Sequence, residues 1–383
     1  MVGTAKVRDN SRAAPIPGRQ QTMERFREQG GRIAAVLPIH YPRALLRAHR
    51  ILPVEIWGPA QAFTPLADSR LQSYICPLAR NALDFLLREG ARRVDMVLVP
   101  HTCDSLQGLG SLLLDQAHLD RPTLNFYLPR GAGDASVDYL AAEIRSLSAA
   151  LSRISGRSPR EEELIECVML EEEADSLLSE LLGARPRLPL PDHTFYRVVR
   201  SREYLPAEDF ISSANGVLAG RTSLGAPERL PILLSGIVPE PMEIFDALAG
   251  FGAFAAACDL ACASRRLYPG GKSGDPFRRM AESLLGAPPD FTRGSAIRDR
   301  VRYLRANADK SGARGVLFYP VKFCEPELFD LPLLRKGLDG AGLASTVIEA
   351  PLHPHLSQVL VPRDPGPPPR PGGVTPAGAL PER

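Results

Sequence analysis

Short apolar runs and amphipathic stretches alternate along the first third of the chain. The apolar runs predict strands at residues 32–38, 54–57, 94–99 and 123–128. Between the second and third runs, residues 71–89 predict a helix, with Leu83, Leu86 and Leu87 on one face. Strands that alternate with helices are typical of a parallel, doubly wound sheet. We therefore expect a first α/β domain over residues 23–133.

The middle of the chain has a different pattern. Residues 134–225 show helical periodicity only, and the acidic clusters at residues 161–163 and 171–173 indicate a solvated helix face. Apolar runs return at residues 230–236, 315–319 and 345–349. They predict a second α/β domain over residues 226–352.

Both ends of the chain lack an apolar pattern. Residues 1–22 are polar and basic, and residues 353–383 are rich in Pro and Gly, with too few large apolar side chains to pack. We expect two disordered tails. The predicted fold class is thus α/β, with two Rossmann- or flavodoxin-like parallel-sheet units and a helical insert between them.

Composition and charge exclude several classes of protein. The 383 residues carry a formal net charge of only +2 and no long Lys/Arg run, so neither nucleic acid nor an anionic membrane is expected as a partner. No apolar run approaches the roughly 18 residues that span a bilayer, and the first residues lack a signal-peptide core. Six cysteines are too sparse for a disulfide scaffold. We expect a cytoplasmic protein with free thiols.

Two cysteines occupy matching places in the two halves of the chain. Cys103 and Cys324 each follow an apolar, strand-like run and directly precede an acid, Asp104 or Glu325. Ligands in open α/β sheets collect outside the carboxyl ends of strands, so the two thiols are expected to face one cleft. Cys76 would complete a three-thiolate site. Three thiolates on an iron–sulfur cluster leave one iron open for substrate, whereas the alternative is that each thiol is a small buried apolar group.

The remaining cysteines have simpler interpretations. Cys258 and Cys262 form a C-x-x-x-C pair that fits either two metal ligands on one helix face or a core pair, and the Ala-rich surroundings favour the core. Cys167, in the helical insert, is expected to pack.

Two histidines are candidate catalytic residues. His40 and His101 each stand at the end of a predicted strand, where substrate groups bind. In contrast, the Gly-Gly-Lys-Ser-Gly sequence at residues 270–274 resembles the end of a phosphate loop but follows no apolar strand. This chain is therefore not expected to hydrolyse ATP.

Taken in order, several short motifs resemble the D-component of the 2-hydroxyacyl-CoA dehydratases, a family that also includes subunits of benzoyl-CoA reductase. The resemblance runs from about Ile33 to Glu349 and rests on Tyr41-Pro42, Leu52-Pro53-Val54, Cys76-Pro77, His101-Thr102-Cys103-Asp104, Leu234-Ser235-Gly236, Asp259-Leu260-Ala261-Cys262 and Val321-Lys322-Phe323-Cys324-Glu325-Pro326. It implies that Cys76, Cys103 and Cys324 hold a [4Fe–4S] cluster.

The resemblance also implies an activity and partners. Members of this family lose water from a 2-hydroxyacyl-CoA after a separate ATP-hydrolysing iron–sulfur activator supplies one electron, which forms a ketyl radical and is later returned. The chain would then be a lyase subunit that acts on an acyl-CoA, in a heterodimer with a homologous second subunit. The helix N-terminus near Ser235-Gly236 is a candidate site for the CoA phosphates.

Three alternatives stay open. A benzoyl-CoA reductase-like subunit would be an oxidoreductase that consumes reductant. A non-catalytic cluster or scaffold subunit is favoured by Arg43, which follows Tyr41-Pro42 where the family commonly has an acid. The third alternative is a structural α/β protein with buried thiols.

Overall fold

The computed structural model describes residues 16–58, 63–88, 90–117, 119–131, 133–221 and 229–350, together with residues 352, 354 and 356. Most of the two predicted tails, residues 1–15 and 357–383, lies outside the described residues. Within the described ranges, no helix combines the length and the apolar character needed to cross a membrane.

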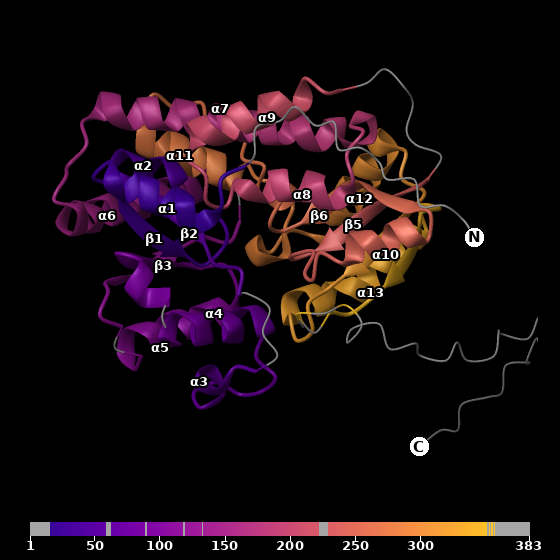
Figure 1. The fold of residues 1–383 in the computed structure, drawn as a ribbon, viewed down its shortest axis with the longest axis horizontal. Helices are drawn as coiled ribbons and strands as arrows, with labels where there is room; N and C mark the ends of the chain where they lie inside the picture. Colours follow the sequence, from indigo (N-terminus) through magenta and orange to yellow (C-terminus); the bar gives the residue numbers. More distant parts are fainter. Residues whose placement is uncertain are drawn as a thin grey trace, which may run out of the picture.

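Two four-stranded sheets form the frame of the molecule (Figure 1). The first unit has strand order β2-β1-β3-β4, with β1 (Arg32–Val36), β2 (Ile51–Glu55), β3 (Met96–His101) and β4 (Thr123–Tyr127). The second unit has order β6-β5-β7-β8, with β5 (Leu230–Gly236), β6 (Ala253–Leu260), β7 (Gly315–Tyr319) and β8 (Ala344–Val347). All neighbouring strands are parallel. The predicted fold class is confirmed, and the two sheets share one topology.

The helices of the first unit begin where short polar or proline-containing segments end. They are α1 (Arg19–Glu28), α2 (Arg43–Ala48), α3 (Pro65–Asp68), α4 (Pro77–Arg88), the 3₁₀ turn η1 (Gly90–Arg93) and α5 (Asp104–Asp115). Helix α4 starts later than predicted because Pro77 occupies the first helical position, where its missing N–H costs nothing. Cys76 consequently precedes the helix. At the other end of the unit, α1 begins inside the predicted tail, where Arg19 donates to the backbone oxygen of Glu55.

The helical insert lies across both units, and α7 contacts both α2 and β6. It consists of α6 (Asp134–Ser155), α7 (Glu161–Ala184), η2 (Arg185–Arg187), α8 (Asp192–Ser201) and α9 (Ala207–Leu218). One sequence prediction is wrong here: Glu171 does not lie on a solvated helix face but is 6% exposed. Its carboxylate is buried because two guanidiniums compensate it, Arg202 at 2.5 Å and Arg43 at 3.3 Å.

The helices of the second unit do not all cover their own sheet. They are α10 (Ile244–Gly250), η3 (Ser264–Arg266), α11 (Pro276–Leu285), η4 (Phe291–Arg293), α12 (Ile297–Ser311) and α13 (Glu325–Asp339). Met280, Ala281 and Leu284 of α11 pack in the same core as Ala34 of β1 and Leu45 of α2. Figure 1 shows α11, in orange, beside the indigo α2. This crossing ties the second unit to the first.

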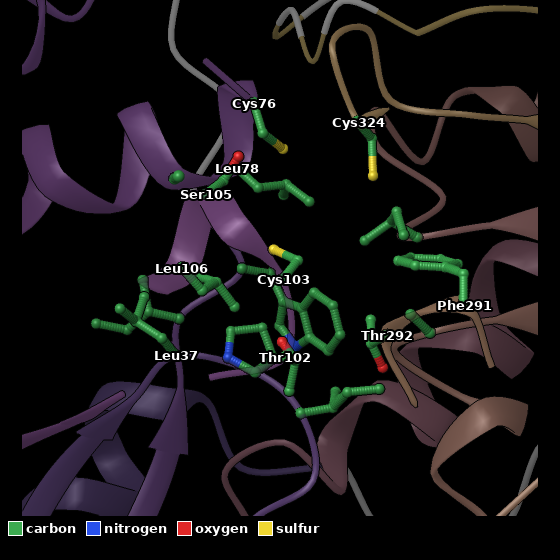
Figure 2. A pocket seen from close by; sticks show the side chains of 17 residues that line it. Leu37, Cys76, Leu78, Thr102, Cys103, Ser105, Leu106, Phe291, Thr292 and Cys324 are labelled. Atoms are coloured by element: carbon green, nitrogen blue, oxygen red, sulfur yellow. The ribbon is translucent and has the colours of Figure 1, made fainter. Parts of the chain in front are cut away.

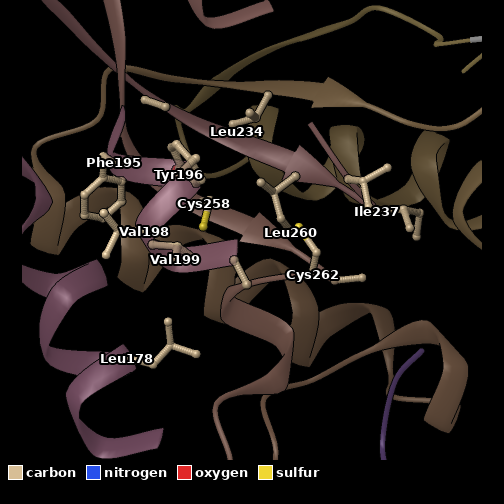
Figure 3. Close-up of a cluster of buried hydrophobic side chains, with 14 of the residues drawn as sticks. Leu178, Phe195, Tyr196, Val198, Val199, Leu234, Ile237, Cys258, Leu260 and Cys262 are labelled. Atoms are coloured by element: carbon tan, nitrogen blue, oxygen red, sulfur yellow. The ribbon is translucent and has the colours of Figure 1, made fainter. Parts of the chain in front are cut away.

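The largest core joins the helical insert to the second sheet (Figure 3). Tyr196 of α8 stacks on Phe245 of α10 at 4.5 Å, and Cys258 and Cys262 are buried in the same cluster. Cys258 belongs to β6 rather than to a helix. The pair therefore packs in the core, as the Ala-rich surroundings predict. Cys167 is half-buried against the core of the first unit, in agreement with its predicted packing role.

Candidate functional site

One pocket of about 70 Å³ lies where the two units meet, and three cysteines line it. Figure 2 shows the thiols of Cys76 and Cys103 approaching from the first unit and that of Cys324 from the second. The structure thus brings together the three residues that the sequence singled out, from positions almost 250 residues apart at the extremes. All three are free thiols.

Each of these cysteines stands at the start of a helix. Cys76 directly precedes α4, Cys103 is the N-cap of α5, and Cys324 is the N-cap of α13. Cys103 and Cys324 are also topologically equivalent, because β3 and β7 are the third strands of sheets with the same order. Unpaired N–H groups and the helix dipole favour negative charge at such positions.

The surroundings set the protonation of the three thiols. The hydrogen bond with Cys324 and the backbone amides of Leu78 and Ala79 lower the pKa of Cys76 despite its burial. The same thiol–thiol hydrogen bond, together with burial, raises the pKa of Cys324. Burial raises the pKa of Cys103 to about 12 although amides of α5 oppose the shift. A positively charged group bound between the thiols would favour all three thiolates.

The donor set fits an iron–sulfur cluster. Among the described residues, no three His, Cys, Asp or Glu side chains converge closely enough to hold a single metal ion. A polynuclear cluster needs ligands that stand further apart, and Cys76, Cys103 and Cys324 supply three soft sulfur ligands around one pocket. These three residues are the ones that would hold it.

The rest of the pocket is apolar or uncharged. Its walls are built mainly from Leu37, Ile39, Ile56, Trp57, Leu78, Leu106, Ile237, Ala261 and Phe291, with three hydroxyl groups from Thr102, Ser105 and Thr292. No described lining residue carries a charge. Such walls exclude water and strengthen any electrostatic interaction inside.

A buried carboxylate fixes Trp57 in the first-unit wall. Glu55, at the end of β2, accepts hydrogen bonds from the Trp57 indole (3.0 Å) and the Tyr41 hydroxyl (2.8 Å). Arg266 of the second unit approaches it at 2.5 Å, and Arg43 donates to it at 3.1 Å. Although burial opposes the shift, Arg266 and Arg43 hold the pKa of Glu55 below its usual range. Arg43 is thus a buried structural cation.

A second buried network supports Phe291 in the second-unit wall. Arg265 contacts Asp259 and Glu327, each at 2.9 Å. The guanidiniums of Arg265 and Arg300 lie over the Phe291 ring, at 5.3 and 5.5 Å from its centroid. Both interactions hold the aromatic ring in place.

Neither predicted histidine lines this pocket. His40 is completely buried and its Nδ1 lies 3.1 Å from the Tyr268 hydroxyl; burial lowers the pKa of its imidazole to about 3. The ring of His101 packs edge-on against Tyr127 at 4.3 Å, and burial lowers its pKa as well. In both cases residues beside the histidine line the pocket instead, namely Ile39 and Thr102.

The phosphate site expected near Ser235-Gly236 is corrected by the structure. Ser235 is fully buried and donates to Asp259 at 2.8 Å, so its hydroxyl is already committed. A Cβ at Gly236 would lie 2.4 Å from the Tyr319 carbonyl oxygen, which shows that this strand end is packed rather than open.

Sequence reasoning missed Trp57, Phe291 and Thr292. Trp57 follows the end of β2 by two residues, so the rule that located Cys103 would also have found it. Phe291 and Thr292 stand on a short turn far from any strand end, and no local signal marks them.

Comparisons with known proteins identify the family of this chain. Residues 38–360 match the family model described as 2-hydroxyglutaryl-CoA dehydratase, D-component. A benzoyl-CoA reductase subunit of Thauera aromatica is 25% identical, over 79% of this chain and 81% of its own length. The (R)-phenyllactyl-CoA dehydratase beta subunit of Clostridium sporogenes is 22% identical, over 85% and 88% respectively. The beta subunit of (R)-2-hydroxyglutaryl-CoA dehydratase from Acidaminococcus fermentans is 20% identical, over 83% and 86%. Because the family model covers most of the chain, this protein belongs to the 2-hydroxyglutaryl-CoA dehydratase D-component family.

Proposed function

We propose that this chain is the subunit of a 2-hydroxyacyl-CoA dehydratase that holds a [4Fe–4S] cluster through Cys76, Cys103 and Cys324. The observation that carries the proposal is the convergence of three thiols, each at a helix start, on one uncharged pocket. The reaction would remove the 2-hydroxyl group and a C3 hydrogen from the acyl-CoA as water and leave an enoyl-CoA. This elimination has no net change in oxidation state, so an activating electron is returned.

The residues of the chain prepare the pocket for this chemistry. When bound, the cluster would supply one-electron chemistry and a Lewis-acidic iron open to the substrate. The amides of Leu78 and Ala79 stabilise the Cys76 thiolate, and those of Ser105 and Leu106 act on Cys103. Trp57 and the other apolar walls keep water from the reacting atoms. The catalytic roles of His40 and His101 stay predictions.

We further infer that two proteins work with this chain. One is a homologous second subunit, because the relatives are themselves named as subunits of larger enzymes. The other is an ATP-hydrolysing iron–sulfur activator, since the phosphate-loop-like sequence at residues 270–274 follows the turn η3 and not a strand. The free thiols and the weak net charge support a location in the cytoplasm.

The decisive measurement is iron and acid-labile sulfide per chain after anaerobic purification and reconstitution. About four of each, lost when Cys76, Cys103 or Cys324 is changed to Ser, is the expected result. Cys167→Ser is the matched control, because that thiol lies half-buried in the insert and lines no part of the pocket. A colourless parent chain, or equal loss in the Cys167 variant, would refute the assignment.

A benzoyl-CoA reductase-like subunit is the second candidate. It is favoured by the 25% identity to the Thauera aromatica protein. Dehydration returns its electron, whereas ring reduction consumes two for each product. The ratio of reductant consumed to product formed, measured on the complex with its activator, separates the two reactions.

A further inference from the structure

Glu327 is a buried carboxylate in the first turn of α13, three residues after Cys324. It is 4% exposed, and its amide donates to the Cys324 carbonyl oxygen at 3.1 Å. Residues three apart on a helix stand next to each other, with about 5–6 Å between their Cβ atoms. No described residue that lines the pocket carries a charge. Glu327 is therefore a charged group that stands behind the uncharged wall, beside one of the pocket thiols.

The carboxylate of Glu327 is only partly neutralised. Its Oε1 accepts a hydrogen bond from Arg265 at 2.9 Å, whereas the buried Oε2 has no hydrogen-bond partner. Arg265 is shared, because Asp259 lies 2.9 Å and Asp290 3.7 Å from the same guanidinium. Burial raises the pKa of Glu327, although Arg265 and Arg300 oppose the shift. A part of the negative charge thus stays uncompensated inside the protein.

The charge of Glu327 reaches two of the three thiols. The pKa of Cys324 is raised by its hydrogen bond with Cys76 and by burial, and the charges of Cys76 and Glu327 add to this shift. At Cys76 the charge of Glu327 opposes the lowering of the pKa by the hydrogen bond with Cys324. The helix starts favour negative charge at these sulfur atoms. Glu327 acts against them.

Resting on the proposed function, we propose that Glu327 is a positioning residue that lowers the reduction potential of the cluster. Reduction adds one negative charge, and a fixed negative charge beside a buried, uncharged site makes this addition less favourable. The reduced cluster then gives up its electron more readily. A thioester carbonyl accepts an electron only from a strong donor, so a low potential serves the proposed reaction.

Glu327→Gln tests the charge with little change of shape. The amide oxygen of Gln can still accept from Arg265, so the side chain keeps its hydrogen bond and loses its charge. The midpoint potential of the one-electron couple is measured on the reconstituted chain at about pH 8, by anaerobic titration with dithionite followed by electron paramagnetic resonance. We expect the ratio of reduced to oxidised cluster at a fixed potential to rise about tenfold, a shift of about +59 mV. An unchanged or lower potential would overturn the proposal.

Two variants separate the charge from the fold. Glu327→Asp keeps the charge on a shorter side chain, so the potential should stay close to that of the parent even though the poorer fit to Arg265 lowers stability. Glu325→Gln removes the exposed carboxylate next to Cys324, where water screens the charge, and should move the potential much less than Glu327→Gln does. Equal shifts for the two Gln variants, or the same rise for Glu327→Asp as for Glu327→Gln, would contradict the role of the buried charge.

A further variant decides the case if Glu327→Gln does not fold. Asp259→Asn removes a competing carboxylate from Arg265 and leaves this guanidinium freer to neutralise Glu327. The potential should again rise, by less than in Glu327→Gln, and an unchanged potential would refute the assignment.

The role of Glu327 and the proposed function fail in different ways. A parent chain that binds about four irons and shares its potential with Glu327→Gln keeps its cluster and loses the proposed role of Glu327. A parent chain that binds no iron defeats both.

Discussion

The two sheets have the same strand order, but the two units contribute different residues to the pocket. In each, a cysteine that follows the third strand is the N-cap of the next helix: Cys103 lies two residues after β3 and Cys324 five residues after β7. The segments between the second and third strands differ. In the first unit this segment brings a further thiol, Cys76, whereas in the second it brings the turn η4. One topology thus supplies two of the three thiols and most of the pocket wall from the first unit, and the third thiol with a smaller part of the wall from the second.

The two walls also differ in how they are supported. Phe291 rests on Arg265 and Arg300, so its support lies within the second unit. Trp57 is held by Glu55, and Glu55 is compensated by Arg266 from the other unit. The first wall therefore depends on the docking of the two units, whereas the second does not.

The largest effect is expected from Glu55→Ala. Removing this carboxylate takes from the buried Arg266 its ion-pair partner and from Arg43 one of two, since Arg43 keeps Glu171, which should lower the free energy of unfolding by about 3–5 kcal/mol. The Trp57 indole also loses its acceptor, so its emission maximum should shift. Denaturant titration followed by Trp57 fluorescence measures both.

Two further variants serve as a comparison and a control for Glu55→Ala. Asp259→Ala removes a comparable carboxylate in the second unit and should destabilise by a similar amount, yet leave the native emission of Trp57 near that of the parent. Glu208→Ala removes a largely exposed partner of Arg47 and should cost at most about 1 kcal/mol. If Asp259→Ala shifts the emission as much as Glu55→Ala does, the two walls are not supported independently.

A smaller effect is expected from Gly236→Ala, at the end of β5. β1 ends in Val36 at the corresponding place, but a Cβ at Gly236 would lie 2.4 Å from the Tyr319 carbonyl oxygen. Strands β5 and β7 would have to separate, at a cost of about 1–3 kcal/mol in unfolding free energy. Gly216→Ala in α9, where the added Cβ meets nothing within 4 Å, is the control and should be neutral or stabilising. Equal effects of the two substitutions would show that the close approach of Gly236 to Tyr319 does not restrict the residue at this position.

The sequence predicted the shared frame well because both units are encoded by local patterns. Alternation of apolar runs with amphipathic helices indicates parallel sheets, and the carboxyl-end rule then places Cys103 and Cys324 at one cleft. The topology explains why this worked: two sheets of the same order place their third strands alike.

The differences between the units could not be predicted in the same way. Glu171 reads as a solvated helix residue, because its partners Arg43 and Arg202 are distant in sequence and only tertiary packing brings them together. Phe291 and Thr292 reach the pocket from an irregular turn that Asp290 holds by its side chain. His40 follows a strand as expected, yet its ring is completely buried beside Tyr268.

The last effect concerns this histidine: it is absent at neutral pH and grows as the pH falls. Burial lowers the pKa of His40 to about 3, below the value of about 6.5 expected in the unfolded chain. Above pH 6.5 both states are neutral and the group contributes no pH dependence. Below it only the unfolded state takes up the proton, so stability should fall by about 1.4 kcal/mol per pH unit, toward pH 3.

His40→Asn isolates this contribution. Asn tolerates the left-handed backbone at this position (φ 62°) and cannot titrate, so its unfolding free energy should fall less steeply than that of the parent between pH 6.5 and 4. Denaturant titrations across this range measure the difference in slope. The two curves should run parallel above pH 7, which serves as the internal control. Parallel curves down to pH 4 would mean that His40 takes up a proton in the folded protein, and its predicted catalytic role would then gain support over a purely structural one.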